Sequence, residues 1–125
     1  MDPLKRQQTS TRIAKVLKAF ELLRLMDREI PGQLVSAFLY VASHSPCHKQ
    51  AMEEDLDLKP ASGSRLIDWL SDYHRLGKPG LGLVIKYKDP LNHRRILVEL
   101  TPKGQSLARQ MRDLIYGDSQ GATYD

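Results

Sequence analysis

Five basic side chains near residue 90 could bind phosphate groups. Lysine attracts a phosphate as a point charge, and arginine can donate two parallel hydrogen bonds to it. Two β-rich runs, 84–87 and 96–100, surround the turn formers 89–93, which predicts two strands joined by a turn with Pro90 at its tip. This hairpin would bring the basic side chains together at one end. They are Lys86, Lys88, His93, Arg94 and Arg95.

A second group of side chains lies at the start of a helix predicted over 60–76. Pro60 suits the first helical position, and Leu66, Ile67 and Leu70 recur at helical spacing. Small residues let a helix approach base edges closely, and hydroxyl or guanidinium groups can donate to bases or phosphates. Alternatively, the two serines of the group only cap the helix. The group comprises Lys59, Ala61, Ser62, Ser64 and Arg65.

The elements that would position these groups follow a simple order. Apolar periodicity predicts helices over 11–29, 33–45, 48–56 and 60–76, then the hairpin, then a helix over 102–116 that Thr101 caps. A very short strand before His48 would add a third strand. A short helix, a turn, a longer helix and a hairpin predict a winged helix-turn-helix, mainly α with a two- or three-stranded antiparallel β wing.

The first predicted helix, 11–29, is amphipathic. Its apolar residues recur at near-helical spacing, with basic residues at the other positions. The apolar residues are Ile13, Val16, Leu17, Phe20, Leu23 and Leu25.

Length and charge indicate one domain with a cationic surface. We expect the domain to span 11–116, between a flexible N-terminus at 1–10 and a flexible acidic tail at 117–125. The net charge is +4, and the positive charge gathers in 1–24 and in the hairpin. This distribution is typical of a phosphate-binding surface, although two solvated faces are the alternative.

Other features bear on the cellular compartment. No apolar stretch is long enough to cross a membrane, and the N-terminus lacks an apolar signal region, so we expect a cytoplasmic protein. Cys47 is the single cysteine and cannot form an internal disulfide, which fits a reducing compartment.

Three further clusters could carry chemistry. His44, Cys47 and His48 could begin a zinc site, but no fourth ligand is evident, and we expect no metal. Cys47 alone could sense oxidation or be an inert core residue. The acidic run 53–55 could act in acid–base catalysis but is more simply the solvated face of a short helix. No nucleotide-binding glycine loop or catalytic triad stands out. We therefore expect a protein that is not an enzyme and that binds no cofactor.

The hairpin and its neighbours resemble the MarR family of transcriptional regulators. The resemblance rests on DPLNHRRILVELTPKG at 89–104, LKPASGSRLIDWL at 58–70 and Gly82-Leu83-Val84 before the first wing strand. It implies a homodimer, formed through the N- and C-terminal helices, that binds palindromic operator DNA and is often released by a small molecule or by oxidation. It also implies that Ser62, Ser64 and Arg65 read the major groove, and that Arg94 is the wing arginine.

Three features depart from the family pattern. Asn92 stands where the family's wing usually has an aspartate that braces the arginine, which puts the bracing of Arg94 in question. The connection 71–81 is longer than usual, and a single C-terminal helix stands where the family has a long pair. These features resemble the compact versions carried by phages and mobile elements.

The sequence therefore predicts a sequence-specific regulator of transcription that binds double-stranded DNA, most simply a repressor that occupies a promoter. Its recognition helix would enter the major groove and its basic wing the minor groove. Two alternatives remain: a winged-helix protein-interaction module, and a replication or partition protein of a mobile element.

Overall fold

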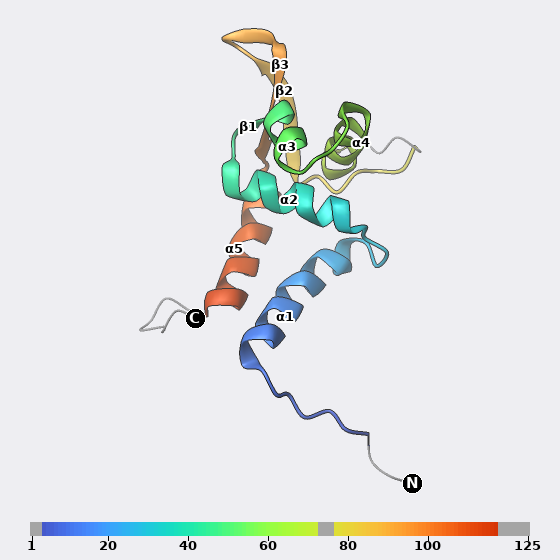
Figure 1. Cartoon of the computed structure of the whole chain (residues 1–125), viewed down its shortest axis with the longest axis vertical. Coiled ribbons are helices and arrows are strands. Elements are labelled where there is room, and N and C mark those ends of the chain that lie inside the picture. The colour runs from blue at the N-terminus through green and yellow to red at the C-terminus, as the bar shows by residue number, and fades with distance from the viewer. Residues whose placement is uncertain (1–3, 73–76, 118–125) are drawn as a thin grey trace.

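A computed structural model describes residues 4–72 and 77–117, which form five helices and three strands (Figure 1). The winged helix-turn-helix expected from the sequence is confirmed. The expected helical residues 73–76, the tail from 118 onward and residues 1–3 lie outside the described residues. In chain order the elements are α1 (Thr11–Met26), α2 (Gly32–His44), β1 (Cys47–His48), α3 (Lys49–Asp55), α4 (Pro60–Leu70), β2 (Val84–Asp89), β3 (Asn92–Leu100) and α5 (Pro102–Tyr116).

The three strands form one antiparallel sheet in the order β1-β3-β2. The short strand expected before His48 is present and includes His48, which pairs with Leu97 of β3. On the other side of β3, Val84 pairs with Leu100, and the hairpin projects from the body as the wing (Figure 1).

Helix α2 forms the centre of the core. It packs against α3, α4, α5 and β3, and Figure 1 shows it between the helix-turn-helix and wing on one side and α1 and α5 on the other. Its wide apolar face is therefore buried on more than one side. Its buried residues are Leu34, Val35, Ala37, Phe38 and Val41.

Most of the apolar side of α1 is exposed. Of the six side chains named above, only Leu23 is buried, and Ile13 and Leu17 are 69% and 59% exposed. The physical reason is that α1 packs chiefly against α5, which cannot cover a wide apolar stripe. Helix α1 also ends three residues before the expected Glu29, because the Asp27 carboxylate accepts the backbone N–H of Glu29 at 3.0 Å and favours a turn.

Helix α4 ends at Leu70, earlier than the apolar pattern indicated. The backbone N–H groups of the segment before β2 donate hydrogen bonds to the last carbonyls of α4. Leu81 donates to Trp69 at 2.9 Å, and Leu83 donates to Leu70 at 2.7 Å. The helix end is thus satisfied by the incoming strand, which stops the helix and joins α4 to the base of the wing.

The start of α5 was predicted correctly. The Thr101 hydroxyl accepts the N–H of Gly104 at 3.0 Å and donates to the carbonyl of Gly82 at 2.7 Å. The Thr101 side chain therefore caps α5 and joins it to the segment that precedes β2. The base of the wing, α4 and α5 thus meet at one hydrogen-bonded junction.

Candidate nucleic-acid interface

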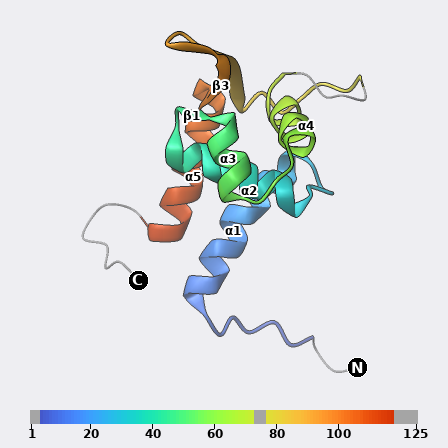
Figure 2. The ribbon, with the colours of Figure 1, turned by 45° about the horizontal axis from the view of Figure 1, so that its top comes forward.

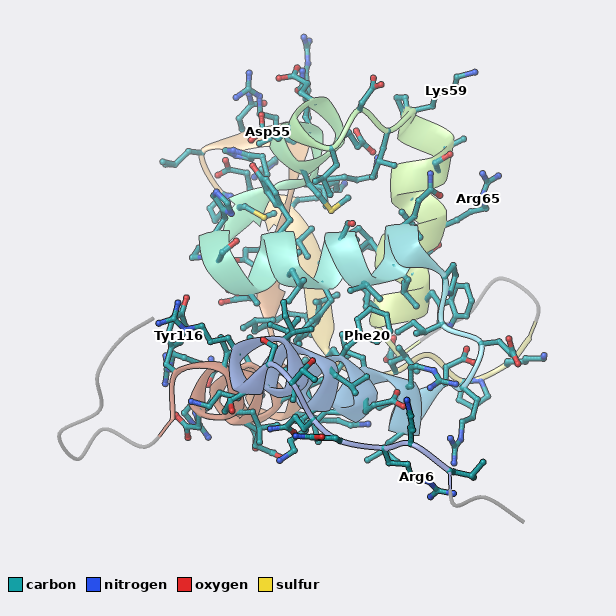
Figure 3. The ribbon with its side chains drawn as sticks, turned by 60° about the horizontal axis from the view of Figure 1, so that its bottom comes forward. Arg6, Phe20, Asp55, Lys59, Arg65 and Tyr116 are labelled. Atoms are coloured by element: carbon teal, nitrogen blue, oxygen red, sulfur yellow. The ribbon has the colours of Figure 1, made fainter. Side chains whose placement is uncertain are left out.

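The first turn of α4 presents the predicted recognition residues at the surface. Lys59, Ala61 and Arg65 are exposed, while Ser62 and Ser64 are half-buried. Figure 3 shows Lys59 and Arg65 extending away from the body of the molecule. The Arg65 guanidinium donates to the Ser62 hydroxyl at 3.2 Å, so the two side chains form one polar unit. No side chain caps the start of α4, and the alternative that Ser62 and Ser64 serve as caps there is wrong.

A buried carboxylate holds α4 against α3. Glu53 is only 7% exposed, and its carboxylate pairs with the ammonium of Lys49. Lys49 also donates to the carbonyl of Pro60, the first residue of α4, at 3.3 Å. The expectation that the acidic run 53–55 is a solvated face is thus wrong for Glu53, because Gly63 of α4 has no side chain and leaves room for the carboxylate.

A second acid of this run, Asp55, also has a structural contact. The Tyr40 hydroxyl donates to the Asp55 carboxylate at 2.6 Å, which raises the pKa of Tyr40 to about 12. The contact joins α2 to α3, so the acidic run stabilises the helix-turn-helix.

The basic residues of the wing lie in an irregular part of the hairpin. Lys88 pairs with Ile96 and the next residue, Asp89, pairs with Asn92, so the three residues between these partners have no partner on β2. Such a bulge bends a strand and redirects its side chains. The three residues are His93, Arg94 and Arg95, and all are exposed.

Two side chains shape the wing turn. The Asn92 carbonyl oxygen accepts the backbone N–H of Arg94 at 3.2 Å, so Asn92 braces the backbone of the wing arginine. The Asp89 carboxylate accepts the N–H of Leu91 at 2.9 Å and lies 2.7 Å from Nε2 of His48. The hydrogen bond from His48, followed by that from Leu91, lowers the pKa of Asp89 and keeps the carboxylate charged at neutral pH.

The wing and α4 border a common groove. Lys86 of β2 donates to the Asp68 carboxylate of α4 at 2.6 Å. Next to this pair lies a groove of about 380 Å³ that Lys49, Ser64, Lys86 and Lys88 help to line. Lys88 is exposed, whereas Lys86 is engaged by Asp68 and holds the wing to the helix.

The two basic regions of the sequence lie at opposite ends of the molecule. Figure 1 and Figure 2 place α1 and the N-terminal segment away from the wing, and Figure 3 shows Arg6 on the side opposite Lys59. Residues 4–24 therefore do not join the basic surface around the wing. The cationic surface that the structure assembles comes from α4, β2 and the wing turn.

The His44–His48 segment has structural contacts. His44 stacks on Tyr40 with ring centroids 4.1 Å apart, and His48 bonds to Asp89. Burial raises the pKa of the Cys47 thiol, which disfavours the reactive thiolate. Among the described residues, no group of three or more potential ligands could hold a metal ion.

Several residues that shape this surface were missed by sequence reasoning. Glu53, Gly63 and Asp68 position α4, and His48 and Asp89 position the wing turn. Asp89 could have been suspected, because aspartate at a turn often accepts a nearby backbone N–H. The Lys49–Glu53 pair is an i,i+4 pair within one helix, but the contacts of Glu53 with Gly63, Asp68 with Lys86 and His48 with Asp89 join separate elements and leave no local signal.

Comparison with known proteins places the fold. No protein-family model matches the chain, and no curated protein matches it. Solved structures do match. A mutant of MepR from a Staphylococcus aureus clinical isolate has a TM-score of 0.62 and 18% identity over 87% of this chain and 77% of its own.

Two further structures carry bound molecules. A mutant of Escherichia coli MarR complexed with operator DNA has a TM-score of 0.60 and 19% identity over 84% of this chain and 68% of its own. NadR in complex with 4-hydroxyphenylacetate has a TM-score of 0.60 and 17% identity over 91% of this chain and 79% of its own. These proteins are MarR-family transcriptional regulators, and the chain has their winged-helix fold, as the sequence resemblance implied. None of the described helices is long and apolar enough to span a membrane.

Proposed function

We propose that this protein is a sequence-specific transcriptional regulator, a repressor that binds double-stranded DNA. The observation that carries the proposal is the arrangement of two exposed cationic elements, the first turn of α4 and the wing bulge, on either side of a lysine-lined groove. The fold is shared with a MarR protein whose structure contains operator DNA, which supports the same use of these elements.

In this proposal the start of α4 enters the major groove. Arg65 would bond to a guanine edge or a phosphate, and the Ser62 hydroxyl that holds it would limit its rotamers. Ser64 can reach a base edge or phosphate, and the methyl group of Ala61 can contact a thymine methyl. Lys59 supplies a phosphate contact at the helix start.

The wing would contact the minor groove and the backbone beside it. Arg94 and Arg95, redirected by the bulge, can extend into a narrow A·T-rich minor groove, and His93 and Lys88 are placed for phosphate. Lys86 acts indirectly in this arrangement, because its ammonium is already bonded to Asp68 and fixes the wing relative to α4.

We further propose a homodimer formed through α1 and α5. The exposed apolar side of α1, which includes Ile13, Val16, Leu17 and Phe20, requires a cover in water, and a second copy provides one. Tyr116 of α5 is also 48% exposed, at the same end of the molecule (Figure 3). A two-fold dimer would present two copies of α4 to a palindromic site. A small-molecule effector and a cytoplasmic location complete the proposal, and the ligand bound to NadR supports the former.

The test is fluorescence anisotropy of the full chain with a labelled random duplex across a salt series, followed by selection of bound sequences. Binding should weaken steeply with salt and enrich a palindrome, with the log–log slope falling by about 0.9 for each phosphate contact removed. Enrichment without symmetry would support a replication or partition role. Absence of binding at low salt would overturn the proposal and favour the protein-interaction module.

Variants separate the roles of the residues. Arg65→Ala should cost about 1–3 kcal/mol of binding and relax the preference at one base position. Arg94→Ala should weaken binding to all sequences. Lys18→Ala on α1 is the matched control, because it removes a charge at the far end and should leave the salt slope unchanged.

A further inference from the structure

The wing turn is tied to the start of the helix-turn-helix by one hydrogen bond across the sheet. His48 is the last residue of β1 and directly precedes α3. Its Nε2 lies 2.7 Å from Oδ2 of Asp89, the last residue of β2, although β3 lies between these two strands. The Asp89 side chain is only 13% exposed, so water competes weakly for this bond.

The same carboxylate organises the turn itself. Its other oxygen, Oδ1, accepts the backbone N–H of Leu91 at 2.9 Å. A charged acceptor makes stronger hydrogen bonds than a neutral one, and Asp89 makes both of its bonds as a carboxylate. Any movement of the turn therefore has to break a bond either to Leu91 or to His48.

The hydrogen bond between His48 and Asp89 lies where it can hold the basic residues of the wing in place. Pairing with β1 supports β3 only at Leu97 and Val98, and the bulge begins directly beyond Ile96. Beyond that point the described hairpin projects from the body (Figure 1). Asp89 lies at the far side of the bulge, so its bond to His48 fixes the end of the hairpin that carries Arg94 and Arg95.

We propose that His48 is a positioning residue for DNA binding, which acts through Asp89 to set the place of the wing arginines relative to α4. The proposal rests on the proposed function, because it assumes that the wing contacts DNA. His48 itself does not need to touch DNA. A wing held in place before binding loses less conformational entropy on binding, which increases affinity without adding a contact.

A double-mutant cycle tests this role. His48→Ala should weaken DNA binding by roughly tenfold, the scale of one hydrogen bond to a charged group. In the Arg94→Ala/Arg95→Ala background, the same change should have no further effect, because the side chains that it positions are gone. Equal losses in both backgrounds would overturn the proposal, since His48 would then act by another route.

Rescue and control variants exclude a general structural effect. His48→Gln keeps an N–H donor near the position of Nε2 and should restore most of the affinity, whereas His48→Leu should not. His44→Ala is the matched control, because His44 stacks on Tyr40 and has no bond to the wing. The affinity of this variant for DNA should equal that of the wild type. Failure of His48→Gln to rescue, with circular dichroism showing a folded protein, would count against the tie.

A measurement without DNA separates this inference from the proposed function. Backbone amide relaxation over 91–95 should show increased fast motion in His48→Ala and little change in His48→Gln. Unchanged relaxation in His48→Ala would overturn the tie even if DNA binding is affected. If motion over 91–95 increases in His48→Ala but the wild type binds no DNA at low salt, the proposed function fails. The positioning role in DNA binding then fails with it.

Discussion

Glu53 lies directly against Gly63, and a side chain at position 63 would occupy the space of its carboxylate. A Cβ built on Gly63 would be 2.6 Å from Cγ and 2.8 Å from Cδ of Glu53, far closer than van der Waals contact. The glycine lets α3 and α4 approach closely, and Lys49 neutralises the acid that fills the space. A glycine inside the helix therefore stabilises the packing that sets the direction of α4.

Gly63→Ala should lower the free energy of unfolding by about 1–3 kcal/mol, because the new methyl group displaces Glu53 or moves α4. Urea denaturation measures the change, and operator binding should weaken as α4 shifts. The double variant Gly63→Ala/Glu53→Ala should lose less stability than the sum of the two single variants, since the clash is gone. Additive losses would show that the two residues do not compete for space.

Gly104→Ala should also destabilise the protein by about 1–3 kcal/mol. A Cβ at Gly104 would overlap the carbonyl oxygen of Leu83 and lie 3.1 Å from its carbonyl carbon, and a backbone group cannot turn aside as a side chain can. Gly32→Ala is the matched control, because nothing lies within 4 Å of its Cβ position. The control should change stability by less than about 0.5 kcal/mol, and a loss equal to that of Gly104→Ala would contradict the packing argument.

Leu17→Glu should convert the proposed dimer into a monomer. Leu17 is 59% exposed in the single chain, so a charge there costs little in a monomer but is costly when buried between two copies. Sedimentation equilibrium gives the mass. Ile85→Glu, which changes a side chain that is 47% exposed on β2, is the control and should remain dimeric. A wild-type protein that sediments as a monomer at high concentration would refute the dimer proposal.

Asp89 should contribute stability that depends on pH. Its pKa is lower in the folded than in the unfolded chain, so the contribution is present above the unfolded value and is lost as the pH falls through the folded value. The difference in urea midpoint between wild type and Asp89→Asn should therefore shrink in acid. Asp113→Asn, which changes an exposed carboxylate of α5, is the control for the loss of one negative charge. A difference that stays constant with pH would argue against the ionised contact.

Cys47 should react slowly with thiol reagents in the folded protein. Burial raises the pKa of its thiol, so less thiolate is present at a given pH than in the unfolded chain. The reaction rate with a disulfide reagent, followed from neutral to alkaline pH, should rise only at higher pH than in urea. Cys47→Ser supplies the background rate. A fast reaction at neutral pH would point instead to a redox-sensing cysteine.

Elements whose signals are local were predicted well from the sequence. Thr101 and Pro102 mark the start of α5 because a cap and a proline act within one turn, and the observed helix has the predicted bounds. The wing was predicted because turn formers separated two β-rich runs. The hydrogen bonds that define such elements join residues close in sequence, so the residue types alone carry the information.

What tertiary structure decided involves residues far apart in the chain. The pattern of α1 was read correctly as amphipathic, but only the fold shows that little within the described residues covers its apolar side. The sequence indicated that Glu53 is a surface acid, but the fold packs it against Gly63. Helix α4 ends at Leu70, because the carbonyl of Leu70 accepts the backbone N–H of Leu83. His48 and Asp89 are separated by 41 positions, and no local pattern pairs them. The sequence by itself determined which segments become helices, strands and turns, while the three-dimensional packing decided which charges are paired and which remain exposed, because pairing depends on distances that only the folded chain sets.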